Sequence, residues 1–523
     1  MLWSGWGDPA QARELSPEVL ELLGGALGVR APAPAVEMAQ VRLPAPRLAD
    51  GAAERLAAVV GAEHVRTDDE ARLLHTRGKS TPDLLRIRSG DASAAPDAVV
   101  LPGSHEEVVA LLAACSQGRV VVVPFGGGTS VVGGLEPDRE GFAGVVALDL
   151  RRLDRLVDLD EVSRTATLEP GLRGPDAEAL LGERGYTIGH HPQSFLYASI
   201  GGFAAARSSG QASAGYGRFD ERVVGLRVAT PRGTLELGRA PKSAAGPDLR
   251  QLFLGSEGAF GVITAVRVEV RPAPAVRVYD GWRFGSFPAG AAGLRALIQD
   301  GPVPTVLRLS DEAETALNLA RPSELGAGGE GGCLGIAGYE GTEADVEARR
   351  AGASAVLRGL GAEPDADAGA TWQRDRYSGP YLRDALLGAG AIVETLETTT
   401  FWSGIDGLYA GVGGALRDTL TGLGSPPVVL CHISHVYRSG ASLYFTIGAA
   451  MLDDPLAQWG AAKTAASDAI LAAGGSITHH HGVGRDHREH YAREIGPLGV
   501  DALRAVKAAL DPEGILNPGV LVK

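Results

Sequence analysis

Three consecutive histidines, His479, His480 and His481, lie between a Gly-Gly-Ser turn and Gly482-Val-Gly484. An imidazole titrates near neutral pH, so these residues could act as a general base or acid. Consecutive residues of an extended segment alternate sides, so we expect at most two of the three to face one pocket. The alternative is a histidine tract that binds a metal or is simply exposed.

A tyrosine and two arginines are further candidates. Tyr444 belongs to the alternating run SLYFT at 442–446, which predicts a strand, and a strand tyrosine more commonly faces the core. Arg383 in YLRD and Arg308 in VLRL would each ordinarily be solvated surface residues. A guanidinium can donate two hydrogen bonds to one phosphate, so two such arginines in an acidic chain would suit a phosphorylated substrate.

The strongest local signal is the glycine loop PFGGGTS at 124–130, directly after an apolar run. Its glycines permit positive φ and leave no Cβ in the path of a ligand, while successive N–H groups can converge on a phosphate. The loop lacks the GxxxxGK(S/T) pattern of a P-loop. Asp149 lies about as far after the loop as the acidic residue that binds the ribose in a Rossmann fold. The glycine spacing differs from the Rossmann pattern, however, and the glycines and proline of 131–137 disfavour the helix that should follow. A plain tight turn is the alternative.

Two other clusters place glycines and small hydroxyl residues where strands are expected to end. One consists of GHHPQS at 189–194, SIGG at 199–202 and ARSSG at 206–210, and the other is GSEGAFGVI at 255–263. Together with the first loop they would suit one extended ligand that carries a diphosphate and a flat ring system.

The predicted elements around these loops alternate between helix and strand. A capping box at 104–107 precedes Val108, Leu111, Leu112 and Cys115, which fall on one helix face. Strands are predicted at 120–124 and within 145–170, 222–238 and 262–271, and helices at 17–27, 175–185 and 499–510. A glycine-rich surface loop is predicted at 326–332.

Composition narrows the class of protein. A chain of 523 residues is too long for one core, so we expect two or three domains. A net charge of −14 without a Lys/Arg cluster argues against a nucleic-acid partner. Three widely spaced cysteines argue against disulfides and a zinc site, so no metal is expected. With neither a signal peptide nor a long apolar run, we expect a cytoplasmic protein without a transmembrane segment; peripheral membrane contact stays open.

The three glycine clusters, as PFGGGTSVVGG, SIGGFAAARSSG and GSEGAFGVIT, resemble the FAD-binding domain of the vanillyl-alcohol-oxidase and para-cresol-methylhydroxylase superfamily. Within it the sequence is more similar to alkyldihydroxyacetone-phosphate (alkylglycerone-phosphate) synthases and their bacterial relatives. This similarity covers most of the chain, including WSGWGD at 3–8, GKSTPDLLRIRSG at 78–90, ATPRG at 229–233 and SITHHHGVGR at 476–485.

The resemblance implies an α+β fold of four segments. These are an N-terminal arm at 1–45, a two-subdomain FAD-binding domain at 46–275, an α+β cap at 276–475, and a C-terminal helical segment at 476–523 that returns the histidine motif to the active site. It also implies non-covalent FAD, with Gln193 where the family usually has Asp. The residues implied to hold the FAD are Pro124, Phe125, Gly126, Gly127, Gly128, Thr129, Ser130, Gln193, Ser194, Ser199, Gly201, Gly202, Ala206, Arg207, Ser208, Ser209, Glu257, Gly258, Gly261, Val262 and Ile263.

The implied reaction exchanges the acyl chain of acyl-dihydroxyacetone phosphate for a fatty alcohol through a flavin N5 adduct, a step of ether lipid biosynthesis. Tyr444 aligns with the family's proton donor and acceptor, and a histidine of 479–481 would share the proton transfer. Arg383 and Arg308 match arginines that would hold the phosphate. The implied partners are a lipid-like phosphorylated substrate and a fatty alcohol; a homodimer stays open.

The alternative function is an FAD-dependent oxidase or dehydrogenase of a 2-hydroxy acid or alcohol, because one fold can serve several reactions. The run from His432 to His435 lacks the His-x-Gly-Asp-Gly-Asn-x-His pattern of flavin-dependent hydroxy-acid dehydrogenases. The synthases carry Arg where His432 stands, so details of substrate binding are expected to differ.

Overall fold

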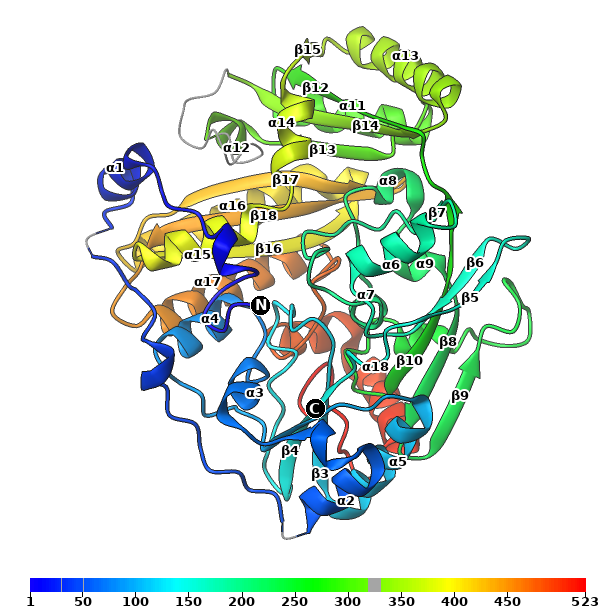
Figure 1. The fold of residues 1–523 in the computed structure, drawn as a ribbon. Helices are drawn as coiled ribbons and strands as arrows, with labels where there is room; N and C mark the ends of the chain where they lie inside the picture. The colour runs from blue at the N-terminus through cyan, green and yellow to red at the C-terminus, as the bar shows by residue number, and fades with distance from the viewer. Residues whose placement is uncertain (30, 50, 318–330) are drawn as a thin grey trace.

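The computed structural model describes residues 1–29, 31–49, 51–317 and 331–523 (Figure 1). The first sheet is formed by strands from the N-terminal part of the chain. Its order is β1 (Val65–Arg66), β2 (Ala98–Val100), β4 (Gly144–Asp149) and β3 (Val120–Phe125), with β2, β4 and β3 parallel and β1 antiparallel. The helices α2 (Ala52–Val60) and α5 (His105–Gly118) share a buried core with it. The alternation of helix and strand that the sequence predicts here is confirmed.

The predicted capping box of α5 is only half formed. Ser104 Oγ accepts from the N–H of Glu107 at 3.1 Å, as expected. The Glu107 carboxylate, however, accepts from the N–H of Gly103 at 2.6 Å, one residue before the cap. The side chain therefore still satisfies an N–H group at the helix start, but not the one that the motif predicts.

The second sheet is antiparallel, in the order β5 (Leu156–Asp160), β6 (Thr165–Leu168), β10 (Val262–Glu269), β8 (Val223–Thr230) and β9 (Gly233–Leu237). The helices α6 (Gly174–Gly182) and α7 (Ile200–Ala205) contribute to its core. β7 (Tyr186–Thr187) and β11 (Arg271–Pro272) form a separate two-stranded pair. The first glycine cluster follows β3 of the first sheet, and the third leads into β10 of the second.

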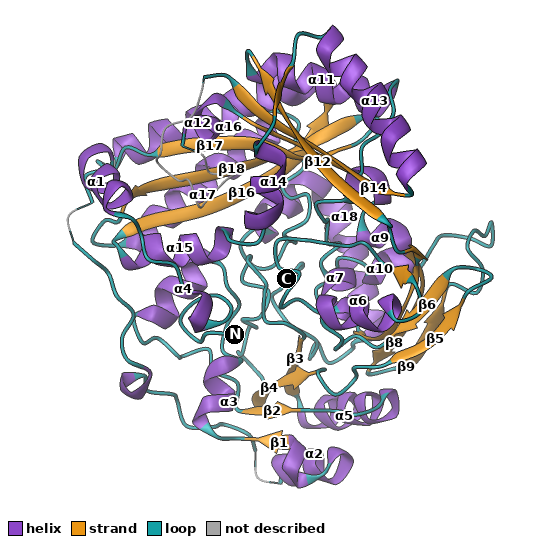
Figure 2. Ribbon diagram, turned by 45° about the horizontal axis from the view of Figure 1, so that its top comes forward, coloured by secondary structure: helices purple, strands orange, loops and turns teal. Residues whose placement is uncertain are grey.

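The third sheet has seven antiparallel strands (Figure 2). Their order is β15 (Glu363–Asp365), β12 (Val276–Phe284), β14 (Cys333–Gly341), β13 (Val306–Ser310), β17 (Val428–Val436), β18 (Gly440–Ala450) and β16 (Ala391–Phe401). One face packs against α11 (Phe287–Gln299), α13 (Glu343–Gly359), α16 (Ile405–Gly422) and α17 (Pro455–Ala472), where the largest apolar cluster lies. The opposite face carries Arg308, His432 and Tyr444, which line a cavity, and a smaller apolar cluster that includes Trp372.

The remaining helices connect these layers. They are α1 (Pro17–Ala26), α3 (Asp69–Leu74), α4 (Thr81–Arg88), α8 (Ser213–Tyr216), α9 (Phe219–Arg222), α10 (Arg250–Phe253), α12 (Glu312–Ala316), α14 (Ala368–Asp375), α15 (Gly379–Gly388) and α18 (Arg488–Leu510). The helix predicted at 499–510 is the second half of α18, which bends at Gly496 and Pro497. Among the described residues, no helix is both long and apolar enough to cross a bilayer.

The α+β class predicted from the sequence is confirmed by these layers. The division of the chain at residues 45, 275 and 475 stays a prediction. Most of the surface loop predicted at 326–332 falls at 326–330, which lie outside the described residues.

Candidate active site

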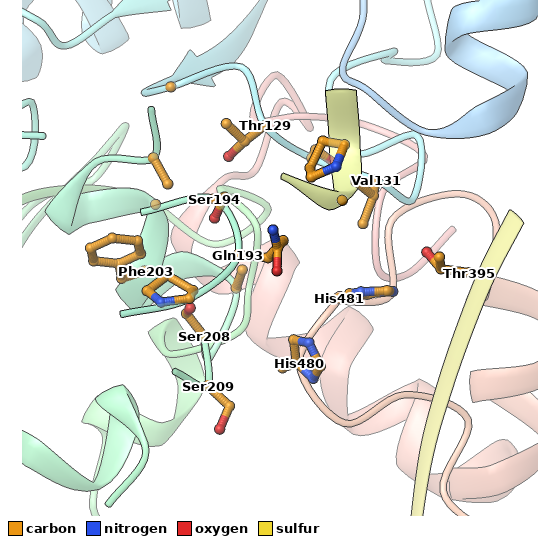
Figure 3. A pocket seen from close by; sticks show the side chains of 18 of the residues that line it. Thr129, Val131, Gln193, Ser194, Phe203, Ser208, Ser209, Thr395, His480 and His481 are labelled. Carbon is orange, nitrogen blue, oxygen red and sulfur yellow. The ribbon is translucent and has the colours of Figure 1, made fainter. Parts of the chain in front are cut away.

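A cavity of about 440 Å³ extends from the glycine loops to the polar face of the seven-stranded sheet. Figure 3 shows Thr129, Ser194 and Ser208 on one side of it and His480 and His481 on another. Tyr444, Arg308 and Arg383 also line it. Residues that are far apart in the sequence, from loops, strands and the C-terminal segment, therefore meet around one space.

The first glycine loop follows β3 and presses against residues 197–199. A Cβ on Gly127 would lie 2.1 Å from the carbonyl oxygen of Tyr197, and one on Gly126 would lie 2.3 Å from Ser199 Oγ. Gly128 has a φ of 68°, which strains any other residue. The loop can follow this path only with glycine, and a phosphate can then approach its backbone.

Most of the predicted cofactor residues line the cavity, but Arg207 and Val262 do not. The Arg207 side chain is directed away, because its Nε donates to the carbonyl of Leu254 at 2.9 Å. Val262 is the first residue of β10 and lies between Gly261 and Ile263, which line the cavity, so its side chain points to the other face of the strand and is buried in the core. A contact of these two residues with the cofactor would therefore have to come from their backbone, and their assignment stays a prediction.

Asp149 holds a structural position. It is fully buried and accepts from His75 Nε2 at 2.8 Å and from Arg151 Nε at 2.7 Å. The acidic residue that binds the ribose in a Rossmann fold would instead face the ligand. The glycine spacing that argued against a Rossmann site thus agrees with the observed geometry.

Glu257 joins the third glycine cluster to the segment after the histidines. Its Oε2 accepts from the N–H groups of Val483 and Gly484, each at 2.8 Å. A Cβ on Gly482 would lie 2.8 Å from the Glu257 carboxylate, so glycine is required there. Burial raises the pKa of Glu257 to about 7. This side chain fixes where the histidine segment enters the cavity.

The three histidines wrap around the buried carboxylate of Glu397, which lies on β16. Glu397 accepts from the N–H groups of His479, His480 and His481 at 2.6, 3.0 and 2.8 Å, and from Thr478 Oγ1 at 2.5 Å. Burial alone would raise the pKa of Glu397, but the adjacent imidazoles hold it well below its ordinary value. The segment is curved by these bonds and is not extended.

That curvature changes which histidines meet the cavity. His480 and His481 are adjacent in sequence and both line it, whereas strict alternation would have paired His479 with His481. His479 is turned away, with its Nε2 2.6 Å from the hydroxyl of Tyr437. At most two of the three histidines line the cavity, as expected. The reason is the curvature of the segment and not the alternation of side chains along a strand.

Removing the charge of Glu397 should loosen this segment. We expect Glu397→Gln to lower the free energy of unfolding by about 2–4 kcal/mol, because an amide cannot accept from all the donors and leaves at least one buried N–H unpaired. Since the folded pKa lies below the ordinary value of 4.5, the wild-type contribution is present above pH 4.5 and is lost as the pH falls further. Urea midpoints at pH 7 and in acid would measure both effects.

Glu161→Gln is a matched control for that comparison, because Glu161 is exposed in the turn between β5 and β6. It should leave the urea midpoint unchanged. Equal midpoints for Glu397→Gln and the wild type at pH 7 would show that Glu397 does not organise the histidine segment.

Tyr444 lies on β18 beside residues of both neighbouring strands, opposite Glu397 and His432. Its ring stacks on His432 at 4.8 Å, and His481 meets it edge-on at 5.5 Å. Burial raises the pKa of Tyr444 to about 12 and lowers the pKa of His481 to about 3. Near neutral pH the phenol is therefore protonated and can donate a hydrogen bond, and the imidazole is neutral and can accept one.

Arg308 belongs to a buried polar network with His432 and Glu314. Its Nη2 donates to Glu314 Oε1 at 2.5 Å and lies 3.0 Å from His432 Nδ1. Burial alone would raise the pKa of Glu314, but His432 and Arg308 hold it below its ordinary value. Arg308 Nε is buried and has no hydrogen-bond partner among the described residues. A donor of this kind in a cavity wall suits an anionic ligand.

Arg383 lies on α15 at another part of the cavity wall. Its Nη1 donates to the carbonyl of Lys79 at 2.7 Å, and its Nη2 donates to Asp384 Oδ1 at 3.1 Å. Trp6 and Arg376 also line the cavity, and the sequence analysis did not single them out. The WSGWGD motif was a signal for Trp6, while Arg376 has no local pattern that separates it from a surface arginine.

The cavity wall fits a dinucleotide cofactor. The glycine loops leave backbone without Cβ atoms along one side, and Gln211 Oε1, which also belongs to a lining residue, is buried with no partner among the described residues. Such an orphaned acceptor suits a ring or ribose that donates hydrogen bonds. The loops could hold a diphosphate, and the histidine and tyrosine side chains would face the rest of the ligand.

Comparisons with known proteins agree with this geometry. Residues 96–238 match the model described as "FAD binding domain", and residues 273–521 match "FAD linked oxidases, C-terminal domain". The chain is 34% identical to an alkyldihydroxyacetonephosphate synthase of Trypanosoma brucei brucei, over 99% of this chain and 92% of that protein. It is similar to a solved alkyldihydroxyacetonephosphate synthase structure, with a TM-score of 0.83, 29% identity and coverage of 99% of this chain and 98% of the other. A structure of p-cresol methylhydroxylase, at 16% identity and a TM-score of 0.68 over 92% of this chain and 99% of the other, shares the fold.

Proposed function

The chain belongs to the alkyldihydroxyacetonephosphate synthase family of FAD-dependent enzymes, and we propose that it exchanges the acyl chain of acyl-dihydroxyacetone phosphate for a fatty alcohol. The observation that carries the proposal is the meeting of Tyr444, His481 and Arg308 in the cavity that the glycine loops line. The similarity to the synthases over almost the whole chain supports the choice of substrates. The reaction would be a step in ether lipid synthesis.

FAD, when bound, supplies the ring system at which the two chains are exchanged. We propose that the glycine loops hold it without a covalent bond, through backbone N–H groups at 126–128 and the hydroxyls of Thr129 and Ser130. Ser199, Ser208 and Glu257 line the same wall and would position the rest of the cofactor. The cytoplasmic location stays a prediction, and a homodimer and peripheral membrane contact stay open.

Proton transfer would be carried by the Tyr444 and His481 pair. As the alcohol oxygen bonds to the substrate carbon, its proton must leave, and the neutral His481 imidazole can accept it. The fatty acid departs as a carboxylate with the electron pair of the C–O bond that breaks. The protonated Tyr444 phenol can donate a hydrogen bond to that departing oxygen. The net change is one C–O bond formed, one broken and one proton released.

Arg308 would hold the phosphate through its unpaired Nε donor. We expect Arg308→Lys to raise the KM for acyl-dihydroxyacetone phosphate at least about tenfold with a smaller change in kcat, because lysine keeps the charge beside Glu314 but loses the forked donors, and a hydrogen bond to a charged group contributes about 1.5–3 kcal/mol. Steady-state kinetics with the acyl substrate varied would measure the change.

The control for this variant is Arg438→Lys, because Arg438 is exposed between β17 and β18. Its kinetic constants should match those of the wild type. An Arg308→Lys enzyme with an unaltered KM would remove Arg308 from the phosphate site.

The proposed function is tested by its products. The purified enzyme would be incubated with acyl-dihydroxyacetone phosphate and a labelled long-chain alcohol. We expect label in an alkyl ether and release of one fatty acid for each ether formed. Release of fatty acid without label in an ether would mean hydrolysis, and the proposal would fail.

A further inference from the structure

His435 forms a second histidine cluster with two members of the three-His segment. One ligand-capable atom from each of His435, His479 and His480 lies within 4.8 Å of the other two. His479 Nδ1 and His480 Nδ1 are 3.0 Å apart. Tetrahedral bonds of about 2.0–2.1 Å to imidazole nitrogens place the ligand atoms about 3.3–3.4 Å apart, so a small adjustment of these rings would suffice.

A β-bulge explains why His435 reaches this cluster. On β17 the register shifts between Ile433, opposite Leu443, and His435, opposite Ser442. The extra residue breaks the alternation, so Ser434 and His435 both line the cavity. Bulges next to active sites commonly redirect one side chain in this way.

The imidazole of His435 lacks a partner. The side chain is only 6% exposed, yet across the described part of the chain neither of its ring nitrogens has a hydrogen bond. His479 is held differently, because its Nε2 is hydrogen-bonded to Tyr437 and its Nδ1 points into the cluster. A hydrogen bond on the second ring nitrogen is how proteins orient a metal-binding histidine.

The charges around the cluster favour a cation. The carboxylate of Glu397 lies 3.5 Å from His480 Nδ1 and is buried. Arg218 donates to the carbonyl of His479, but its own charge is balanced by Asp220 at 2.9 Å.

We propose that His435, His479 and His480 bind a divalent transition metal, with zinc as the probe and the fourth coordination position open to the cavity. Imidazole nitrogens suit zinc, and three histidines with one open position form a known type of zinc site. The cavity gives the ion a path, because His435 and His480 both line it. This site departs from the expectation, drawn from the cysteines, that the chain has no metal.

A metal bound at this site would affect turnover. This inference rests on the proposed function. A metal on His480 and His479 would take the nitrogen lone pairs beside His481 and place a positive charge next to the proton-transferring pair. Zinc should therefore inhibit the wild-type enzyme reversibly, and a chelator should restore activity.

Direct binding tests the site without reference to activity. The untagged holoenzyme would be equilibrated with zinc chloride, separated by gel filtration, and analysed for zinc and FAD per chain, with the affinity measured by calorimetry. We expect about one zinc per chain for the wild type. His435→Gln and His480→Gln should each bind at least about tenfold more weakly, since losing even a second-shell partner costs about 10- to 100-fold.

His490→Gln is the matched control, because His490 lies on α18 and contacts Asp468 away from the cavity. It should bind zinc like the wild type. FAD content and thermal midpoint would show that each variant is folded. Because two variants are tested, the experiment still gives a result if one of them fails to fold. A wild type that retains no zinc, or folded His435→Gln and His480→Gln proteins that retain it fully, would overturn the proposal even if the synthase reaction is established. If zinc binds as expected while no ether forms, the proposed function fails and the metal site stands.

Discussion

Tyr444→Phe is expected to lower kcat by about 10²- to 10⁴-fold, the usual contribution of a positioned acid or base. The substitution removes only the hydroxyl, so the stacking of the ring on His432 at 4.8 Å should persist. FAD content and the thermal midpoint should therefore match the wild type. Single-turnover formation of labelled ether, measured with FAD-saturated protein, would separate a loss of chemistry from a loss of substrate binding.

Tyr491→Phe is the control for this experiment. Tyr491 lies on α18, does not line the cavity, and its loss should leave the rate unchanged. A Tyr444→Phe enzyme that keeps near-normal turnover would remove Tyr444 from the mechanism, and the assignment of the acid and base would have to move to the histidines.

Gly127→Val is expected to abolish FAD binding. Its Cβ would lie 2.1 Å from the carbonyl oxygen of Tyr197 and 2.9 Å from Ala198 Cα, both backbone atoms that cannot rotate away. The loop must therefore shift by more than an ångström, which would displace the N–H groups that we propose hold the diphosphate. We expect the protein to purify without flavin and to bind added FAD at least about 100-fold more weakly, which corresponds to about 2.7 kcal/mol.

Gly407→Ala provides the matched glycine control. Gly407 lies in α16, where an added Cβ meets nothing within 4 Å. It should keep its FAD and gain slight stability, because alanine is favoured over glycine in a helix by about 1 kcal/mol. Visible flavin absorbance per chain would compare the two variants. A yellow Gly127→Val protein with full FAD content would show that the diphosphate lies elsewhere.

Short-range features of this protein could be predicted from the sequence. The glycine loop after β3 follows from three glycines after an apolar strand, and the observed contact of Gly127 with Tyr197 gives the physical reason for it. The GVG sequence after the histidines is likewise explained by the approach of Glu257 to Gly482. Local backbone requirements leave a local pattern in the sequence, so the strand and the glycine loop after it could be predicted, whereas the binding of a cofactor by this loop stays a prediction.

Features that depend on long-range pairing could not be predicted. Glu397 meets the histidines across about 80 residues, and its place depends on the register of β16 against β18. Strand position also decides which side chains face the cavity, because the Val262 side chain points away from it, whereas Gly261 and Ile263 line it. The bulge that turns His435 toward His479 has no sequence signal, since it is set by the pairing of β17 with β18.

The proposed reaction of this flavoprotein forms an ether without net oxidation. The most direct test uses purified FAD-containing enzyme under anaerobic conditions, without an electron acceptor, supplied with acyl-dihydroxyacetone phosphate and a labelled long-chain alcohol. We expect repeated turnover, with label in an alkyl ether and the flavin oxidised at the end. No label in an ether, together with bleaching of the flavin by a simple alcohol or 2-hydroxy acid, would contradict it and identify an oxidase or dehydrogenase built on the same fold.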